Sequence, residues 1–318
     1  MQFATLVPAY KTQYMVELLN ALRCQTVRPD LIIVSDDSPH GTFRELMQST
    51  PYLPLTAGLP IEYAEGPRRG AYENFKHLVK LWAGRSDYVH VMLDDDLIYP
   101  DFYERHRRAH ASGHFSCSVS RRWSASESGQ PTSSQTLPAA LADSPRRMAS
   151  LADDVIFLTA VARCHNWLGE FSNAVFRADC VDLLLEPRMG GVSYAGLWDL
   201  GAFVAAAMRR PICHIQDHLG SFRISPGQNS SKLNSPIMKG AHLGYVALAV
   251  GGRRSGRLAD GLLRQCCELL QPALSVRYGA DPEMSAFCAL LPELAQGLPA
   301  AEDRFVDTWH AFLRDHEM

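Results

Sequence analysis

Short apolar runs alternate with segments of helical hydrophobic spacing over the N-terminal part of the chain. Apolar runs typical of buried strands occur at residues 3–7, 31–34, 61–64 and 88–93. Between them, in segments 15–22 and 75–82, apolar side chains fall at i, i+3, i+4 and i+7, which predicts helices with one buried face. This alternation predicts an α/β fold with a mostly parallel sheet flanked by helices.

The pattern changes in the second half. Residues 120–150 are rich in Ser, Ala, Pro, Arg and Gln without periodicity, which predicts a long loop or a partly disordered insertion. A strand is expected at 171–177 and a helix at 199–209. Beyond residue 230 only helical stripes occur, including Phe305, Trp309 and Phe312, which we expect to be buried in a core or a dimer contact.

Composition narrows the function classes. The 318 residues carry a net charge of −3 without long runs of either sign, which argues against a nucleic-acid partner and favours a small substrate or carrier. No segment approaches the roughly 20 apolar residues of a membrane span, and no signal-like segment precedes the first strand. We therefore expect a cytoplasmic protein, with room for peripheral contact at the inner face of the membrane. The eight cysteines lack Cys-x-x-Cys spacing and are expected to be free, buried thiols.

Three carboxylates, Asp94, Asp95 and Asp96, directly follow the strand expected at 88–93. Like charges held this close repel one another, so they must be solvated or have a cation among them. Their oxygens suit Mg²⁺ or Mn²⁺, with diphosphate oxygens completing the coordination. An acidic, solvent-facing turn is the alternative interpretation.

The other expected strands also end in polar or aromatic residues. In doubly wound sheets, ligands bind at the carboxyl ends of the strands. An aromatic ring can stack on a base, a carboxylate can accept the imide N–H of uracil, and an arginine can pair with phosphate. The candidates in chain order are Pro8 and Tyr10, Asp36 and Asp37, and Arg68 and Arg69. Together they predict a nucleotide-diphosphate site, although the two arginines are also compatible with solvated loop charges.

These segments resemble glycosyltransferase family 2, whose members adopt the nucleotide-sugar-binding GT-A fold. The matching segments are residues 6–10, residues 32–38, Asn74 and residues 93–96. The resemblance implies a GT-A glycosyltransferase domain over residues 1–230, with a nucleotide-binding half at 1–110 and an acceptor half at 111–230. Residues 231–318 would form a helical C-terminal appendage.

The resemblance also implies roles for single residues. Asp94 would contact the ribose or sugar, Asp95 would join the donor site, Asp96 would bind the metal, and Asp36 or Asp37 would bind the base. Asp199 follows Trp198 where the family usually shows Glu-Asp, and it is the candidate catalytic base. The alternative for Asp199 is an acid that stabilises a helix N-terminus.

Segment 222–230 resembles a family segment that contains a metal-binding histidine. Here Ser225 stands in place of that histidine. His218 and His214 lie close enough upstream for one of them to replace it, and His218 is the candidate ligand, with a packed or surface side chain as the alternative. Arg223 is a candidate for pairing with the diphosphate, with a surface salt bridge as the alternative.

The sequence therefore predicts an inverting glycosyltransferase that uses Mn²⁺ or Mg²⁺ and a nucleotide-sugar donor, with UDP as the expected nucleotide. The family resemblance implies a glycan or lipid-linked glycan acceptor in surface polysaccharide synthesis. A catalytically inactive nucleotide-sugar-binding module remains open because of Trp198 and Ser225. A sugar nucleotidyltransferase is disfavoured, since residues 8–12 lack the glycines of a triphosphate-binding loop.

Overall fold

The computed structural model describes residues 1–225, 228, 232 and 234–318, so residues 226, 227, 229 and 230 of the predicted segment 222–230 lie outside the described residues. Contacts divide the chain into two compact units that are interleaved in sequence. The first unit comprises residues 1–150, 168–185 and 209–225, and the second comprises 151–167, 186–208 and 226–318. The predicted boundary at residue 230 stays a prediction.

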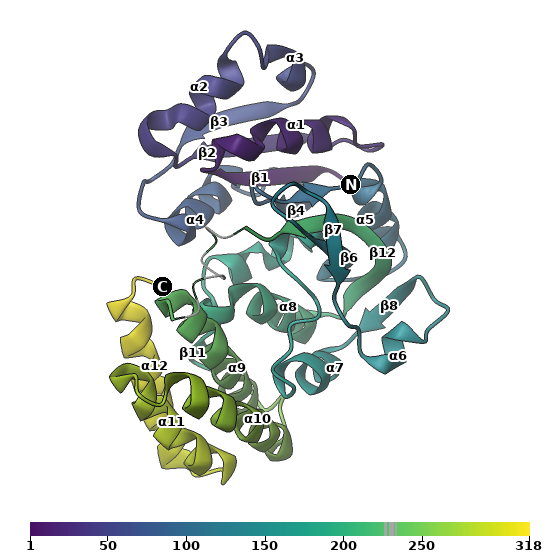
Figure 1. Cartoon of the computed structure of the whole chain (residues 1–318). Coiled ribbons are helices and arrows are strands. Elements are labelled where there is room, and N and C mark those ends of the chain that lie inside the picture. The colour runs from purple at the N-terminus through teal and green to yellow at the C-terminus, as the bar shows by residue number, and fades with distance from the viewer. Residues whose placement is uncertain (226–227, 229–231, 233) are drawn as a thin grey trace. The chain divides into compact units, whose positions relative to one another are not determined.

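The first unit is built on the predicted alternation of strands and helices (Figure 1). Its parallel strands are β1 (Phe3–Ala9), β2 (Leu31–Asp36), β3 (Ile61–Glu65) and β4 (Tyr88–Val91), in the spatial order β3-β2-β1-β4. The helices between them are α1 (Met15–Arg23), α2 (Thr42–Gln48), α3 (Leu53–Thr56) and α4 (Ala71–Trp82). The predicted apolar faces of α1 and α4 are buried, which confirms the helical spacing.

The sheet continues beyond β4 with mixed directions. The added strands are β9 (Ala174–Arg177), β6 (Cys117–Ala125), β12 (Ile212–Arg223) and β5 (Leu97–Ile98). β9 is antiparallel to both β4 and β6, whereas β12 runs parallel to β6. Helix α5 (Phe102–Ala111) follows β5. The α/β prediction is confirmed, and its parallel character holds for β1 to β4.

Residues 120–150 do not form the predicted unstructured loop. They contain the end of β6, then β7 (Pro131–Ser134), α6 (Ala139–Ala142) and most of β8 (Met148–Leu151). β7 pairs with β6. Gln216 of β12 donates its backbone N–H to Arg147 O (2.9 Å) and its side-chain amide N–H to Leu141 O (2.7 Å). These short polar strands are held by main-chain pairing and not by an apolar face, so they leave no periodic signal.

The strand predicted at 171–177 begins later than expected. Residues Phe171–Asn173 form a 3₁₀ turn, and only Ala174–Arg177 is strand. The turn is closed by a capping box, in which Glu170 N–H donates to Asn173 Oδ1 (2.8 Å).

The second unit is mainly helical (Figure 1, green to yellow for α9 to α12). Its elements are α7 (Asp153–Ile156), a π-helical turn (Phe157–Val161), β10 (Arg188–Met189), β11 (Val192–Ser193), α8 (Trp198–Arg209, whose last residue falls in the first unit), α9 (Pro236–Arg254), α10 (Asp260–Tyr278), α11 (Pro282–Ala295) and α12 (Pro299–Asp315). Asp281 caps α11 by accepting from Glu283 N–H and Met284 N–H, with proline at the first helical position.

Phe305, Trp309 and Phe312 are buried in the core of this unit, and Trp309 Nε1 donates to Ser193 O (2.7 Å). They pack on Phe287 and on one another, as the helical spacing predicted. All eight cysteines are free thiols, although Cys24 is exposed. Within the described residues, no helix is long and apolar enough to cross a membrane.

Candidate active site

Hydrogen bonds join the carboxyl ends of β1 and β4. Tyr10 N–H and Lys11 N–H both donate to Asp94 Oδ2, at 2.6 and 2.5 Å. Asp37 N–H donates to Ala9 O (2.9 Å), which brings the end of β2 to the same edge. This edge therefore carries three of the predicted groups on adjacent strands, as parallel topology requires.

The acidic triplet, Asp94 to Asp96, is buried. None of the three residues is more than 6% exposed, so the predicted alternative of a solvated acidic turn does not describe this site. Burial raises the pKa of Asp94 to about 7, although the N–H groups of Lys11 and Tyr10 oppose the shift. Burial also raises the pKa of Asp96, and the charges of Asp95 and Glu170 add to this effect.

Asp96 has one engaged and one open oxygen. Its Oδ1 accepts from Arg223 N–H (3.2 Å), while its buried Oδ2 has no hydrogen-bond partner among the described residues. A buried, unpartnered carboxylate oxygen with a raised pKa is unfavourable by itself and fits a hard cation. In the part of the chain that the structure describes, no group of three or more His, Cys, Asp or Glu side chains is arranged to hold a metal.

Arg223 connects several parts of the first unit and is only 2% exposed. Its Nε donates to Asp95 O (2.9 Å), and its Nη atoms donate to Glu127 O and to the Glu17 carboxylate. Its guanidinium also lies over the Tyr14 ring, 4.3 Å from the centroid. The contact with Glu17 spans 206 residues and left no signal in the sequence. A diphosphate would have to compete with Glu17 for this guanidinium.

Asp36 and Asp37 have different surroundings. Both oxygens of Asp36 are used locally, Oδ1 by Ser38 N–H (2.9 Å) and Oδ2 by Arg44 N–H (2.7 Å). Asp37 Oδ1 accepts from Arg68 N–H (2.5 Å). A Cβ on Gly66 would lie 2.6 Å from this Asp37 oxygen, so glycine permits the close approach of the loop after β3. Asp36 therefore stabilises the turn after β2, and Asp37 lies at the edge of the sheet where β1, β2 and β4 end.

The remaining donor candidates are more exposed. Tyr10 is 57% exposed and Pro8 is half-buried. The side chains of Arg68 and Arg69 reach Glu65 (2.8 Å) and Glu73 (3.8 Å), respectively. Arg68 also borders a polar pocket of about 280 Å³ at the ends of β2 and β3. The roles of these residues stay predictions.

His218 is packed within the first unit. It stacks on Trp123, with ring centroids 4.0 Å apart, and its Nε2 lies 2.7 Å from Ser134 Oγ. Burial, helped by the Arg121 charge, lowers the pKa of His218 to about 4. It lies five positions before Arg223 in β12, and metal binding by His218 stays a prediction.

Lys11, Arg122 and Glu170 belong to this edge but were not predicted as a group. The ammonium of Lys11 pairs with Asp95, and the guanidinium of Arg122 forms two hydrogen bonds with Glu170. Lys11 could have been found from its position directly after Tyr10. The partnership of Arg122 with Glu170 depends on the pairing of β6 with the segment before β9, which the sequence did not reveal.

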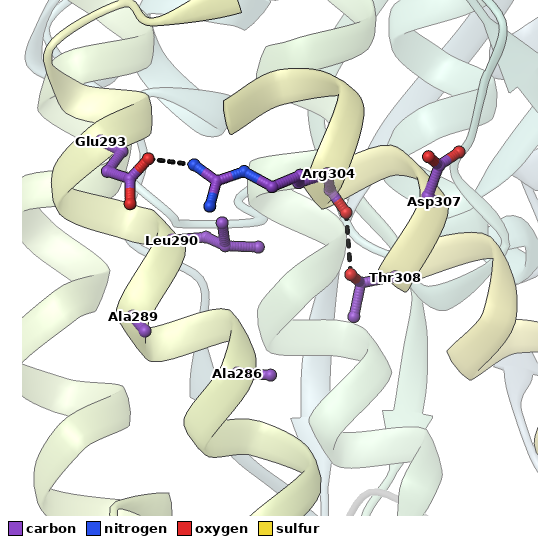
Figure 2. Close-up of a pocket in the computed structure, with 7 residues that line it drawn as sticks. All are labelled: Ala286, Ala289, Leu290, Glu293, Arg304, Asp307 and Thr308. Carbon is purple, nitrogen blue, oxygen red and sulfur yellow. Dashed lines mark hydrogen bonds and ion pairs between the residues drawn. The ribbon is translucent and has the colours of Figure 1, made fainter. Parts of the chain in front are cut away.

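Asp199 belongs to the second unit. It lies in the first turn of α8, and its position at the start of a helix agrees with the prediction. The second unit also has a pocket of about 380 Å³ between α11 and α12. Figure 2 shows the Glu293–Arg304 ion pair at one side of this pocket, with Ala286, Ala289 and Leu290 on α11 and Asp307 and Thr308 on α12. None of the predicted site residues lines it.

Comparison with known proteins places the fold. No protein-family model and no curated protein sequence matches the chain. Among solved structures, residues 1–349 of S. aureus TarS in complex with UDP-GlcNAc match 100% of this chain and 92% of that chain, with a TM-score of 0.59 and 14% identity. The mannosyltransferase PcManGT from Pyrobaculum calidifontis in complex with GDP-Man and Mn²⁺ matches 98% of this chain and 84% of that chain, with a TM-score of 0.52 and 14% identity. Both cover the sheet and the C-terminal helices, and this chain therefore has the GT-A fold.

Proposed function

We propose that this chain is a glycosyltransferase that moves a sugar from a nucleotide diphosphate sugar to an acceptor hydroxyl, with inversion. UDP is the proposed nucleotide, and Mn²⁺ or Mg²⁺ the proposed cofactor. The observation that carries the proposal is the open, buried Oδ2 of Asp96 at the end of β4, beside the exposed Tyr10 at the end of β1. The complexes of similar structures with UDP-GlcNAc and with GDP-Man and Mn²⁺ support it.

The donor would be held by residues at the ends of the parallel strands. The exposed ring of Tyr10 can stack on a base, and the carboxylate of Asp37 can accept the imide N–H of uracil. Asp94 is held by two backbone N–H groups and is directed to the ribose or sugar in this proposal. Arg68 or Arg69 would pair with phosphate, since both side chains are exposed beside the ligand edge.

Asp96 would hold the divalent ion, because its buried Oδ2 is a hard ligand without a hydrogen-bond partner among the described residues. When bound, such an ion neutralises charge on the leaving diphosphate as a Lewis acid. His218 would have to leave Ser134 and Trp123 to join it.

Asp199 is the proposed base that takes the proton of the acceptor hydroxyl. Two other acids of the proposed acceptor half, Glu170 and Asp217, are engaged by Arg122 and Arg147. A glycan or lipid-linked glycan acceptor remains part of the proposal and rests on the family resemblance.

The proposal is tested by incubating the purified protein with UDP-, GDP-, dTDP- and CMP-sugars, with Mn²⁺, Mg²⁺ or EDTA, and by measuring the released nucleotide. We expect metal-dependent release of UDP from the UDP-sugar, even where water is the only acceptor of the sugar. Asp96→Asn should abolish it, while Asp101→Asn, which removes a carboxylate paired with Arg105 on the next helix, should retain it. Equal release in EDTA, or by the Asp96 variant, would contradict the metal-dependent mechanism. Firm metal-linked UDP binding without any turnover would favour a binding module.

A further inference from the structure

Lys11 contacts two members of the acidic triplet at once. Its backbone N–H donates to Asp94 Oδ2 (2.5 Å), and its side-chain ammonium pairs with Asp95 Oδ2. Both contacts are made from the end of β1 to the loop after β4. Lys11 thus fixes two successive carboxylates from the neighbouring strand, one through its main chain and one through its charge.

Asp96 is left in a different state. Its Oδ1 accepts a backbone N–H from Arg223, and its Oδ2 has no hydrogen-bond partner among the described residues. The guanidinium of Arg223 is directed to the main-chain oxygen of Asp95, to Glu127 O and to Glu17. Among the ion pairs of the described residues, the one that involves the triplet is therefore Lys11 with Asp95.

Burial strengthens the electrostatic effect of the ion pair between Lys11 and Asp95. The three carboxylates are at most 6% exposed, so water screens their mutual repulsion poorly. Burial alone would lower the pKa of Lys11, but the hydrogen bond to Asp95 and the charges of the triplet outweigh it, and the pKa is raised. The ammonium therefore stays charged in its place against Asp95.

We infer that Lys11 is the positioning residue that withholds Asp95 from metal coordination and leaves Asp96 as the metal ligand of the triplet; the inference rests on the proposed metal-dependent donor binding. Its charge has opposite effects on the two ligands. The ammonium repels a bare divalent cation, and it attracts the diphosphate of the donor. A residue that only stabilised the fold would support the binding of both.

The test measures Mn²⁺ alone, and then UDP at saturating Mn²⁺, by calorimetry on the full chain. Lys11→Met should bind bare Mn²⁺ about fivefold more tightly, since the Asp95 carboxylate is released, and UDP about tenfold more weakly, since a positive charge is lost beside the diphosphate. Lys11→Arg keeps the charge and should stay within about threefold of wild type for both. Weaker binding of both ligands by Lys11→Met would overturn the inference.

The variant Asp95→Asn distinguishes the role of Asp95 in metal binding from that of Asp96. We expect it to change Mn²⁺ affinity by less than about threefold, whereas Asp96→Asn should abolish binding. The double variant Lys11→Met/Asp95→Asn should lose the gain seen in Lys11→Met, because that gain comes from the released Asp95 carboxylate. If Asp95→Asn loses as much affinity as Asp96→Asn, then Asp95 is a ligand and the inference is wrong.

Thermal unfolding in EDTA tests the contact without metal or nucleotide. Lys11→Met should lower Tm by about 2–4 °C because Asp95 loses its partner, and adding Asp95→Asn should restore at least half of the loss. Additive losses would overturn the inference while leaving the proposed function standing. If the Tm losses are not additive but the protein binds no Mn²⁺, the proposed function is contradicted. The ion pair between Lys11 and Asp95 would still be supported in that case.

Discussion

The proton acceptor of the proposed reaction is a single carboxylate, and its neighbours decide which one is suitable. Glu170 lies near enough to Asp96 to raise its pKa, yet its own carboxylate is held by two hydrogen bonds from Arg122. Asp217 is paired with Arg147 and lies 4.0 Å from Arg105. Both acids are therefore engaged by guanidinium groups of the first unit. Asp199 in the first turn of α8 remains the candidate.

Asp199→Asn should therefore reduce kcat by at least about 100-fold once an acceptor is known, which is the lower range for loss of a general base. Donor affinity should stay within about threefold of wild type, because the base acts on the acceptor in the transition state. Steady-state kinetics together with UDP titration checks both, with Asp217→Asn as the matched acid replacement. A variant that keeps more than about a tenth of wild-type kcat would assign the base to another residue.

The site residues could be predicted from the sequence only where they directly follow a strand that the sequence itself predicts. The triplet, Tyr10 and Asp37 follow strands with strong apolar signals, so their shared edge was foreseeable. The different surroundings of Asp36 and Asp37 could not be predicted, because they depend on the turn that contains His40 at φ +60°, in which Asp36 accepts from Arg44 N–H. The Glu17 contact of Arg223 depends on tertiary structure alone.

Among the strands, the β6–β7 hairpin is linked to the acidic triplet through Arg223. Arg223 at the end of β12 donates to Glu127 O in the hairpin turn, and a Cβ on Gly129 would lie 3.5 Å from the same guanidinium. This buried arginine thus links the turn to Glu17 on α1 and to the main chain of the triplet. The hairpin should depend on it for order.

Replacing Arg223 by Met should accelerate amide hydrogen exchange at residues 126–130 by about tenfold or more, since the turn loses its charged donor. Exchange in β1 and β2 should change little. Hydrogen exchange with mass spectrometry resolves the two regions, and Arg85→Met, which removes the ion pair of an arginine with Glu62, is the control. Unchanged protection of the hairpin would show that Arg223 does not hold it.

Elements with an apolar periodicity were predictable, and elements held by pairing were not. β1, β2, β4, α1, α4 and the C-terminal helices have buried apolar positions, and β3 has half-buried ones. β7 is largely exposed and polar, and α6 has four residues, so neither produces a pattern above the surrounding composition. The mixed direction of the sheet beyond β4 arises from long-range pairing of β9, β6 and β12.

For the protein as a whole, buried histidines should set the response to acid. His90 bonds the Tyr103 hydroxyl (2.9 Å) and Ser172 O (3.0 Å) in the core of the first unit, and burial lowers the pKa of His90 to about 4 from 6.5. Burial likewise lowers the pKa of His110 to about 4. Between these pH values the two histidines bind more protons in the unfolded chain than in the folded chain, so their contribution to stability is fully present above pH 6.5 and is lost as the pH drops toward 4.

A single histidine shifted this far contributes about 3 kcal/mol to that loss. Urea unfolding at pH 7, 6 and 5 measures this contribution as the difference in pH slope between wild type and a histidine variant. His90→Gln should be less stable than wild type at pH 7 but should lose less of its free energy of unfolding as the pH falls, whereas replacing the exposed His40 by Gln should leave the slope unchanged. Equal pH slopes for wild type and His90→Gln would contradict the linkage.

Metal-linked nucleotide binding at the triplet is the property on which the proposed function depends. It is measured by calorimetric titration of UDP into wild type and Asp96→Asn, each with Mn²⁺ and with EDTA. Wild type should bind UDP at least about tenfold more tightly with Mn²⁺, and the variant, with an unchanged Tm in EDTA, should bind equally weakly in both conditions. If Asp96→Asn keeps the full enhancement by Mn²⁺, the metal does not bind at this carboxylate and the account is wrong.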